Sequence, residues 1–199
     1  MYRFFETIKI INGSLQYIDY HQRRMTNTLN RNYVNAALPS LTDMIEVPSK
    51  YSSGLVKCKV EYNDCQFRIF FDFYKPRIVN SLKLIACDDI NYNYKYCDRQ
   101  LLNELFNKKA NYDDILIVKY ENITDTSFSN IAFSDGEKWY TPSSLLLPGT
   151  ARARMIETGL LIEKNITVYN FREFEYFVLI NSMLENRFSD KKPVSAIAE

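Results

Sequence analysis

The stretch from residue 122 to residue 156 carries several groups whose types and order could perform chemistry. Asp125 comes first, the pair Ser129-Asn130 follows, and Gly149 directly precedes a segment with helical periodicity. Free backbone N–H groups at a helix start, with the positive end of the helix dipole, favour an anion such as a phosphate. A carboxylate such as that of Asp125 can pair with a protonated ring nitrogen. The stretch therefore predicts a site for a phosphorylated ring.

Two cationic residues nearer the N-terminus could complete this site. Lys95 lies thirty residues before Asp125 and could form a Schiff base, provided that burial or neighbouring cations lower the pKa of its amine. Arg24 could bind the phosphate because a guanidinium suits bidentate recognition. Each residue alone also fits a structural role, Asp125 as a turn residue and the two cations on the surface. The interpretation rests on their occurring together and in order.

The elements that must position these residues follow from periodicity and turn signals. Asn12-Gly13 predicts a hairpin within residues 4–18, and Asp19 is expected to cap the helix that carries Arg24. Asp98 is expected to cap the helix that follows Lys95. Further strands are predicted at 55–62, 67–74, 81–87, 115–120 and 129–133, and further helices at 41–45, 98–110 and 150–157. A boundary near Pro76 predicts a small α+β domain, 1–78, and a C-terminal domain, 79–199.

Composition excludes several classes of function. The formal net charge of +1 over 199 residues, without a basic stripe, gives no electrostatic reason to expect nucleic acid as a partner. No apolar run approaches the roughly 18 residues of a membrane span, and residues 1–10 enter a strand pattern without a signal-peptide core. We therefore expect a cytoplasmic protein without a membrane partner. Four cysteines without a C-x-x-C pair, and a single histidine, predict reduced thiols and no metal site.

The ordered motifs resemble those of the class IV, fold-type IV pyridoxal-phosphate enzymes, which include branched-chain and D-amino-acid aminotransferases and 4-amino-4-deoxychorismate lyase. FFETIKIINGSLQYIDYHQRRM looks like the family's F-E-T strand, hairpin and H-x-x-R helix. KYCDR is similar to K-x-x-N-R, and NITDTSFSNIAF to G-x-V-x-E-x-x-x-S-N-hydrophobic-F from its acid onward. WYTP and LLLPGTAR resemble the T-P and L-L-x-G-[IT]-x-R elements, and FVLINSMLE the strand and turn that supply a phosphate-binding hydroxyl. The resemblance covers nearly the whole chain.

The resemblance implies pyridoxal 5'-phosphate as cofactor and assigns a role to each site residue. Lys95 would form the Schiff base and then act as general acid and base, while Asp125 would face the ring nitrogen. The remaining cofactor-binding residues are Arg24, Asn130, Thr150 and Ala151 through their amides, and Ser182. The family's fold would be a two-domain α+β arrangement, with a small α/β domain and a larger pseudo-barrel domain that carries the lysine.

This chain departs from the family's pattern at three places. The segment that normally precedes the F-E-T strand is absent, so we expect a trimmed small domain. Asp125 stands where glutamate is usual and is one methylene shorter. Ala151 replaces a common hydroxyl residue, which leaves only a backbone amide there.

The reaction remains open among three hypotheses. The short chain and the K-x-x-D-R form favour, by analogy, a lyase that converts 4-amino-4-deoxychorismate to 4-aminobenzoate and pyruvate for folate synthesis. The alternative is an aminotransferase for branched-chain or D-amino acids, in which Arg77 or Arg68 would bind the substrate carboxylate. The third is a catalytically inactive member of the family. In the first two cases the partner is a small-molecule amino substrate, and the resemblance implies a homodimer.

Overall fold

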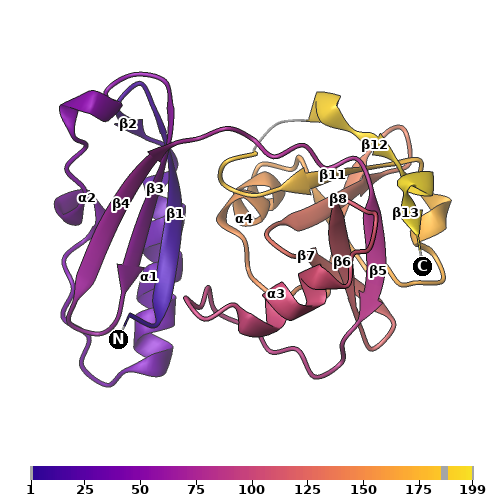
Figure 1. Ribbon diagram of the computed structural model, residues 1–199, viewed down its shortest axis with the longest axis horizontal. Helices are drawn as coiled ribbons and strands as arrows, with labels where there is room; N and C mark the ends of the chain where they lie inside the picture. Colours follow the sequence, from indigo (N-terminus) through magenta and orange to yellow (C-terminus); the bar gives the residue numbers. More distant parts are fainter. Residues whose placement is uncertain (1, 185–187, 199) are drawn as a thin grey trace. The chain divides into compact units, whose positions relative to one another are not determined.

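The computed structural model describes residues 2–184 and 188–198 and divides into two compact units (Figure 1). The first unit comprises the chain up to Pro76 together with Tyr94–Asp98. The second comprises Arg77–Asn93 and the chain from Arg99 onward. Lys95 therefore belongs to the first unit. None of the described helices is both long and apolar enough to cross a membrane.

The first unit is an antiparallel four-stranded sheet, of order β2-β1-β3-β4, with a long helix on one face (Figure 1). Its elements are β1 (Phe4–Ile11), β2 (Ser14–Leu15), α1 (Ile18–Asn32), α2 (Leu41–Met44), β3 (Leu55–Tyr62) and β4 (Phe67–Phe73). The helix α1 buries one stripe, which includes Met25 and Leu29, against inward β1 residues such as Ile8. The period-2 alternation of β1 and β3 puts these apolar side chains on the helix face and leaves charged residues on the other face.

The second unit contains two mixed sheets that share a core. One has the order β13-β5-β6-β7 and the other the order β10-β9-β8-β11-β12. Their strands are β5 (Leu82–Ala86), β6 (Asp114–Lys119), β7 (Asn122–Thr126), β8 (Asn130–Ser134), β9 (Trp139–Pro142), β10 (Ile162–Lys164), β11 (Tyr176–Ile180), β12 (Lys192–Pro193) and β13 (Ile197–Ala198). The helices are α3 (Gln100–Asn107) and α4 (Thr150–Glu157). Side chains from both sheets, including Leu116, Phe133 and Phe177, form one apolar cluster.

Most predicted elements are confirmed, and the differences lie at helix starts and in strands that were not predicted: β7, β10 and the two-residue β12 and β13. The hairpin at Asn12 and the helix from Thr150 form as predicted. Neither predicted aspartate cap is correct: Tyr17, in the left-handed region, precedes α1, and Arg99 precedes α3. Asp19 instead lies in the first turn of α1, where a carboxylate still favours the helix dipole. The strand β7 was not predicted, because Asn122–Thr126 is largely polar although most of its residues are buried.

Candidate functional site

Asp125 lies at the centre of a buried polar cluster in the second unit. Asn130 Nδ2 donates to Asp125 Oδ1 at 2.9 Å and also to Leu147 O at 3.0 Å. The backbone N–H of Leu147 donates to Asp125 Oδ2 at 2.9 Å. Asp125 is on β7 and Asn130 opens β8, so the tight β7–β8 turn brings the two side chains together. Both carboxylate oxygens are thus held in place, and each retains acceptor capacity because an ionised carboxylate can accept about four bonds.

Burial controls the protonation of this carboxyl group. Desolvation raises the pKa of Asp125 to about 6, although the Leu147 and Asn130 hydrogen bonds and the charge of Arg152 act in the opposite direction. No ion pair reaches Asp125 from a cationic side chain in the part of the chain that the structure describes. A positive charge beside the carboxylate would favour its ionised form and lower this pKa.

Gly149 has no room for a side chain at the start of α4. A Cβ at this position would lie 1.9 Å from Asn130 Oδ1 and 3.1 Å from Asn130 Cγ. The close approach puts the amide that holds Asp125 directly against the first turn of α4, which contains Thr150 and Ala151, both buried. Gly149 supplies no capping side chain, and the first N–H groups of any helix lack intrahelical acceptors. This end of α4 is therefore suited to an anion.

The α4 helix is fixed to the sheet by a buried arginine. Arg152 Nη2 donates to Pro142 O at 2.9 Å and forms an ion pair with Glu163 Oε1 at 2.6 Å. Arg152 Nε also donates to Thr141 Oγ1 at 3.3 Å. Since Thr141 and Pro142 are on β9 and Glu163 is on β10, the helix start has a defined place relative to the sheet that contains β8.

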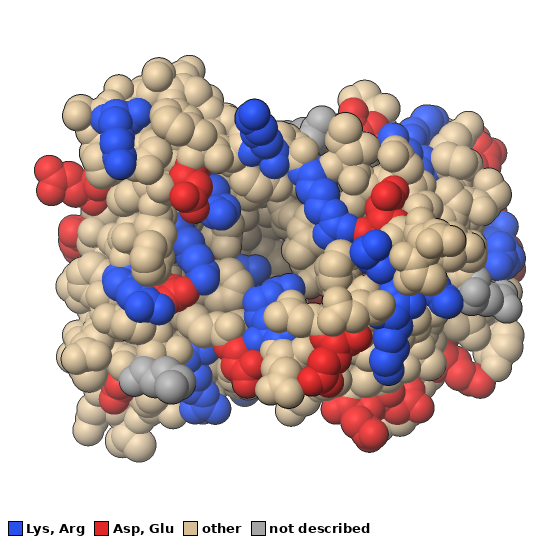
Figure 2. All heavy atoms as spheres, viewed as in Figure 1, with Lys and Arg blue, Asp and Glu red and all other residues tan. Residues whose placement is uncertain are grey.

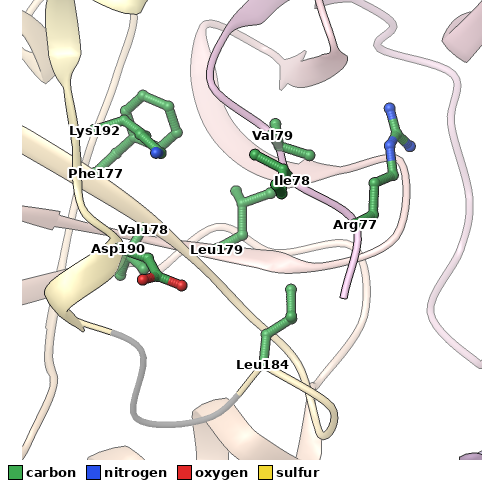
Figure 3. Close-up of a pocket in the computed structure, with 9 residues that line it drawn as sticks. All are labelled: Arg77, Ile78, Val79, Phe177, Val178, Leu179, Leu184, Asp190 and Lys192. Carbon is green, nitrogen blue, oxygen red and sulfur yellow. The ribbon is translucent and has the colours of Figure 1, made fainter. Parts of the chain in front are cut away.

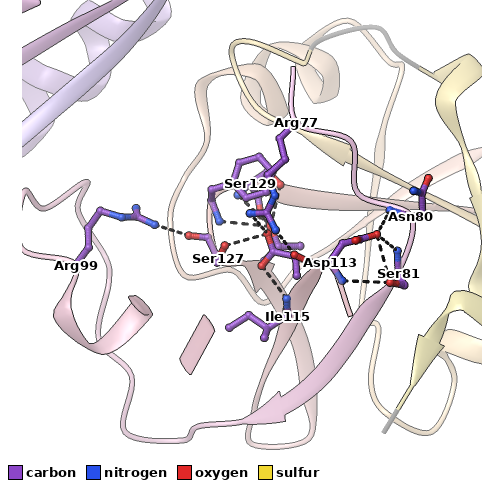
Figure 4. A network of polar contacts seen from close by, with 11 residues as sticks. Arg77, Asn80, Ser81, Arg99, Asp113, Ile115, Ser127 and Ser129 are labelled. Carbon is purple, nitrogen blue, oxygen red and sulfur yellow. Dashed lines mark hydrogen bonds and ion pairs between the residues drawn. The ribbon is translucent and has the colours of Figure 1, made fainter. Parts of the chain in front are cut away.

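A second network holds the turn between Asp125 and Asn130 (Figure 4). Ser127 Oγ donates to Asp114 Oδ2 at 3.0 Å, and Arg99 Nη2 donates to Ser127 O at 2.6 Å. Arg77 Nη1 forms an ion pair with Asp114 Oδ2 at 3.2 Å. Burial raises the pKa of Asp114, against the opposing effects of a backbone donor, Ser127 and Arg77. The network thereby fixes the turn from two sides.

Ser182 lies after β11, in a turn that its neighbour organises. Asn181 Oδ1 accepts from the backbone N–H groups of Met183 and Leu184, at 2.8 and 3.0 Å. Ser182 is half-buried in this turn.

In the first unit, Arg24 is held by a carboxylate that the sequence analysis did not assign. Arg24 Nε and Nη2 donate to Glu6 Oε1 and Oε2 at 2.9 and 2.5 Å. His21 Nδ1 lies 2.7 Å from Glu6 Oε2. Burial favours the protonated form of Glu6, but Arg24 and His21 outweigh it and lower the pKa of Glu6 to about 2. Glu6 is therefore a buried carboxylate that fixes the orientation of the Arg24 guanidinium.

Lys95 is anchored to β1 beside this cluster. The backbone N–H of Phe5 donates to Lys95 O at 2.9 Å, and Lys95 Nζ lies 4.7 Å from the centroid of the Phe5 ring. Tyr94 and Tyr96 instead pack on the ring of Phe4, so Lys95 lies opposite to both, as the alternation predicts. Burial lowers the pKa of His21, and Arg24 and Lys95 lower it further through their charges. The charges of Arg24 and Lys95 therefore both act on His21.

The second unit also contains a hollow (Figure 3). Phe177, Leu179, Arg77, Asp190 and Lys192 are among its lining residues. None of the seven predicted site residues lines it. Cationic and anionic side chains are interspersed over the face shown in Figure 2, in agreement with the small net charge.

The comparisons with known proteins decide the family. The family model described as amino-transferase class IV matches residues 78–187. The chain belongs to the amino-transferase class IV family. Members of this family are usually pyridoxal-phosphate enzymes. The predicted family and the predicted α+β fold are thus confirmed.

Individual proteins are similar to most of the chain. An "Uncharacterized protein" of Haemophilus influenzae (strain ATCC 51907 / DSM 11121 / KW20 / Rd) is 36% identical over 185 residues, which are 92% of this chain and 98% of that protein. The crystal structure of "a putative 4-amino-4-deoxychorismate lyase from haemophilus somnus 129pt" has 30% identity and a TM-score of 0.86, covering 93% of this chain and 98% of that one. The PLP-bound form of a hypothetical aminotransferase from Mycobacterium tuberculosis shares the fold, with 14% identity, a TM-score of 0.76, and coverage of 92% and 78%.

The sequence analysis did not identify the residues that hold the predicted site residues in place. Glu6 stands in the F-E-T motif, and its position two residues after Phe4 on β1 places it on the α1 face. Ser127 and Asp114 were not singled out because their contacts join segments thirteen residues apart. Its place directly before a helical segment did point to Gly149, but the contact with Asn130 that excludes a side chain there is a tertiary feature.

Proposed function

We propose that this class IV protein is a pyridoxal-phosphate-dependent lyase that converts 4-amino-4-deoxychorismate to 4-aminobenzoate and pyruvate. The observation that carries the cofactor assignment is the buried clamp on Asp125, next to a helix start that tolerates no side chain at Gly149. The similarity over nearly the full length to the Haemophilus somnus structure supports the reaction. The cytoplasm is the proposed location.

The described residues fit this cofactor. A protonated pyridine nitrogen would give Asp125 the positive partner that its burial calls for, and acceptor capacity remains on both oxygens. The amides of Thr150 and Ala151 would receive the phosphate at the start of α4, together with Arg24 and the hydroxyl of Ser182. Asn130 would hold Asp125 in position.

When bound, pyridoxal phosphate supplies an aldehyde that reacts with amines and a ring that accepts electrons. Lys95 would provide the amine that attaches the group, and its Nζ would then take and return protons at the reacting carbon. Asp125 would keep the proton on the ring nitrogen, for which its carboxylate must be ionised. Because burial raises the pKa of Asp125 to about 6, the carboxylate of the free protein is mostly ionised only above that pH.

The shorter side chain of Asp125 is compatible with this role. The clamp from Asn130 and Leu147 removes most of the freedom that a carboxylate on a strand would have. A preorganised acceptor loses less free energy on binding than a mobile one. The rigid clamp therefore favours activity over the inactive alternative.

An aminotransferase for branched-chain or D-amino acids is the second candidate. Such an enzyme must bind an α-carboxylate in both half-reactions, and Arg77 and Arg68 are the arginines considered for it. Arg77 is already paired with Asp114, and its guanidinium lies over the ring of Phe106. Arg68 is paired with Glu61, with Nη2 and Oε2 2.5 Å apart. Because both guanidinium groups already have carboxylate partners, the lyase remains the preferred proposal.

The cofactor assignment is tested by labelling the lysine. The protein is incubated with pyridoxal phosphate, reduced with borohydride and mapped by mass spectrometry. We expect the label on Lys95, and we expect Lys95→Ala to lose both the label and the visible absorption of the bound cofactor. Lys59→Ala is the matched control, since Lys59 Nζ lies 4.8 Å from the same Phe5 ring that Lys95 contacts at 4.7 Å. Labelling that persists in Lys95→Ala would disprove the assignment.

The reaction is tested by offering the loaded protein two sets of substrates. We expect 4-aminobenzoate and pyruvate from 4-amino-4-deoxychorismate without any amino acceptor. Lys95→Ala should lower that rate at least about 100-fold, the scale of general acid–base catalysis. A new amino acid formed from an amino donor and 2-oxoglutarate, without lyase activity, would favour the aminotransferase instead.

A further inference from the structure

The strand β7 is irregular at the residue on which the cofactor assignment depends. Its pairing with β6 shifts register between Leu116 and Val118. Across this shift β7 has two residues, Thr124 and Asp125, opposite the single Ile117. Such a β-bulge alters the direction of a side chain and is common beside active sites. The direction of the Asp125 carboxylate therefore depends on how this bulge is held.

The bulge and the turn that follows it have bonds of their own. Thr124 Oγ1 donates to Ile117 O at 2.7 Å. Thr126 N–H donates to Ser129 O at 2.9 Å, and Thr126 Oγ1 accepts from Ser129 N–H at 3.1 Å. The two bonds between Thr126 and Ser129 define the shape of the turn, but they cannot fix its place because both of their ends lie within it.

Ser127 connects this turn to two elements outside it (Figure 4). Ser127 Oγ donates to Asp114 Oδ2 at 3.0 Å, and Asp114 is the first residue of β6. Ser127 O accepts from Arg99 Nη2 at 2.6 Å, and Arg99 directly precedes α3. Ser127 and Asp114 are 7% and 0% exposed, so the bond between them is shielded from water. These contacts place the turn relative to β6 and α3.

The carboxyl group of Asp114 is itself immobilised and can therefore act as a fixed point. Its Oδ1 accepts from the backbone N–H of Ile115 at 2.7 Å, and its Oδ2 also accepts from Arg77 Nη1 at 3.2 Å. Moving Ser127 away would deprive a buried acceptor of a donor, which is unfavourable. Because Ser127 lies only two residues after Asp125, this restraint acts directly on the bulge.

We propose that Asp114 is a positioning residue, which directs the Asp125 carboxylate toward the ring nitrogen of the cofactor by restraining Ser127. Asp114 acts through the turn and not on the reacting atoms. The aspartate at position 125 makes this restraint important, because its side chain has one torsion fewer than glutamate with which to correct a displaced backbone. This role rests on the proposed function, but the effect of Asp114 on Asp125 can be measured without cofactor.

Ser127→Ala tests the link without changing any charge. The pKa of Asp125 is followed in the protein without cofactor by NMR of the Asn130 side-chain amide, which donates to Asp125 Oδ1. That hydrogen bond favours the ionised carboxylate. A displaced turn should weaken it, so we expect the pKa of Asp125 to rise by at least about 0.5. An unchanged pKa in Ser127→Ala would overturn the proposal.

Ser134→Ala is the matched control for this substitution. Ser134 is at the opposite end of β8 from Asn130, is 4% exposed, and its Oγ accepts from the backbone N–H of Gly136 at 3.1 Å. The variant therefore loses a buried hydroxyl group of the same kind without affecting the turn. We expect the pKa of Asp125 to stay within about 0.2 of the wild-type value. An equal rise in Ser127→Ala and Ser134→Ala would contradict a specific role of the link.

An Asp114→Asn background decides whether the hydroxyl group acts through Asp114. Asp114→Asn also removes a charge, so the comparison is made within that background. There, adding Ser127→Ala should change the pKa of Asp125 by less than about 0.2, because substitutions in one network are not additive. A change as large as in the wild-type background would show that Ser127 acts independently of Asp114, and the proposal would be wrong.

Cofactor binding separates this inference from the proposed function. Ser127→Ala should raise the dissociation constant for pyridoxal phosphate at least about threefold, the factor that corresponds to a pKa change of 0.5. Ser134→Ala should leave it unchanged. An unchanged dissociation constant in Ser127→Ala, beside a raised pKa of Asp125, would refute the connection to the cofactor. A wild-type protein that binds no pyridoxal phosphate would refute the proposed function, whereas the free variants would still decide whether Asp114 positions Asp125.

Discussion

Gly149→Ala provides the sharpest test of the clamp on Asp125. The new Cβ would lie 1.9 Å from Asn130 Oδ1, so the Asn130 amide has to move away. That movement breaks its hydrogen bond to the Asp125 carboxylate and its hydrogen bond to Leu147 O. A bond to a charged group contributes roughly 1.5–3 kcal/mol and a neutral one roughly 0.5–1.5 kcal/mol. Alanine returns about 0.4–1 kcal/mol by restricting the unfolded chain, so we expect a net loss of roughly 1–4 kcal/mol.

The assay is urea unfolding at neutral pH, followed by the fluorescence of Trp139. This residue is the single tryptophan of the chain and packs against an apolar cluster of the second unit, so its signal reports on the unit that contains the clamp. The backbone of Gly149 is not an obstacle, because its φ of −67° and ψ of 137° suit alanine. The expected loss therefore measures the clash with Asn130.

A double-mutant cycle decides whether this reasoning is correct. Asn130→Ala removes the amide that the new Cβ would meet, so Gly149→Ala in that background should change the free energy of unfolding by less than about 1 kcal/mol. The two substitutions would then be strongly non-additive, as expected for groups in contact. If Gly149→Ala costs the same in both backgrounds, the clash with Asn130 is not the cause. A cost below about 1 kcal/mol in the wild-type background would also refute the reasoning.

Three further predictions concern the ionised groups. Burial raises the pKa of Asp125 from 3.8 to about 6. The stability that the protonated Asp125 carboxyl contributes is therefore fully present below pH 4 and is lost as pH rises through 6. Asp125→Asn should remove this decline, about 3 kcal/mol, in unfolding followed by Trp139 fluorescence. Arg77→Met leaves Asp114 buried without its guanidinium, and the same assay should show a loss of roughly 2–3 kcal/mol at pH 7 that shrinks in acid. Glu6, with its pKa lowered from 4.5 to about 2, contributes stability that is present above pH 4.5 and lost as pH falls through 2; Glu6→Gln should flatten this dependence, measured by NMR of β1 amides during urea unfolding.

The predictable part of the fold depended on local signals. Alternation in β1 and β3, the Asn12-Gly13 turn and the start of α4 at Thr150 are properties of short segments, and the structure has them as expected. The predicted helix caps are wrong because residue type alone pointed to Asp19 and Asp98, whereas other residues occupy the N-cap position of both helices. The strand β7 was missed because its polar side chains find buried partners, as Thr124 Oγ1 does with Ile117 O.

The family and the order of the chemical groups can be recognised from short sequence motifs alone. A lysine, an acid and a glycine before a helix are recognisable because each needs a particular residue type within a short motif. Tertiary structure decided how these groups are held. The amide of Asn130 reaches Leu147, seventeen residues away, and Glu6 reaches Arg24 across eighteen residues. Such partners depend on how strands and helices pack, and burial, which sets the pKa values of Asp125 and Glu6, exists only once the chain has folded.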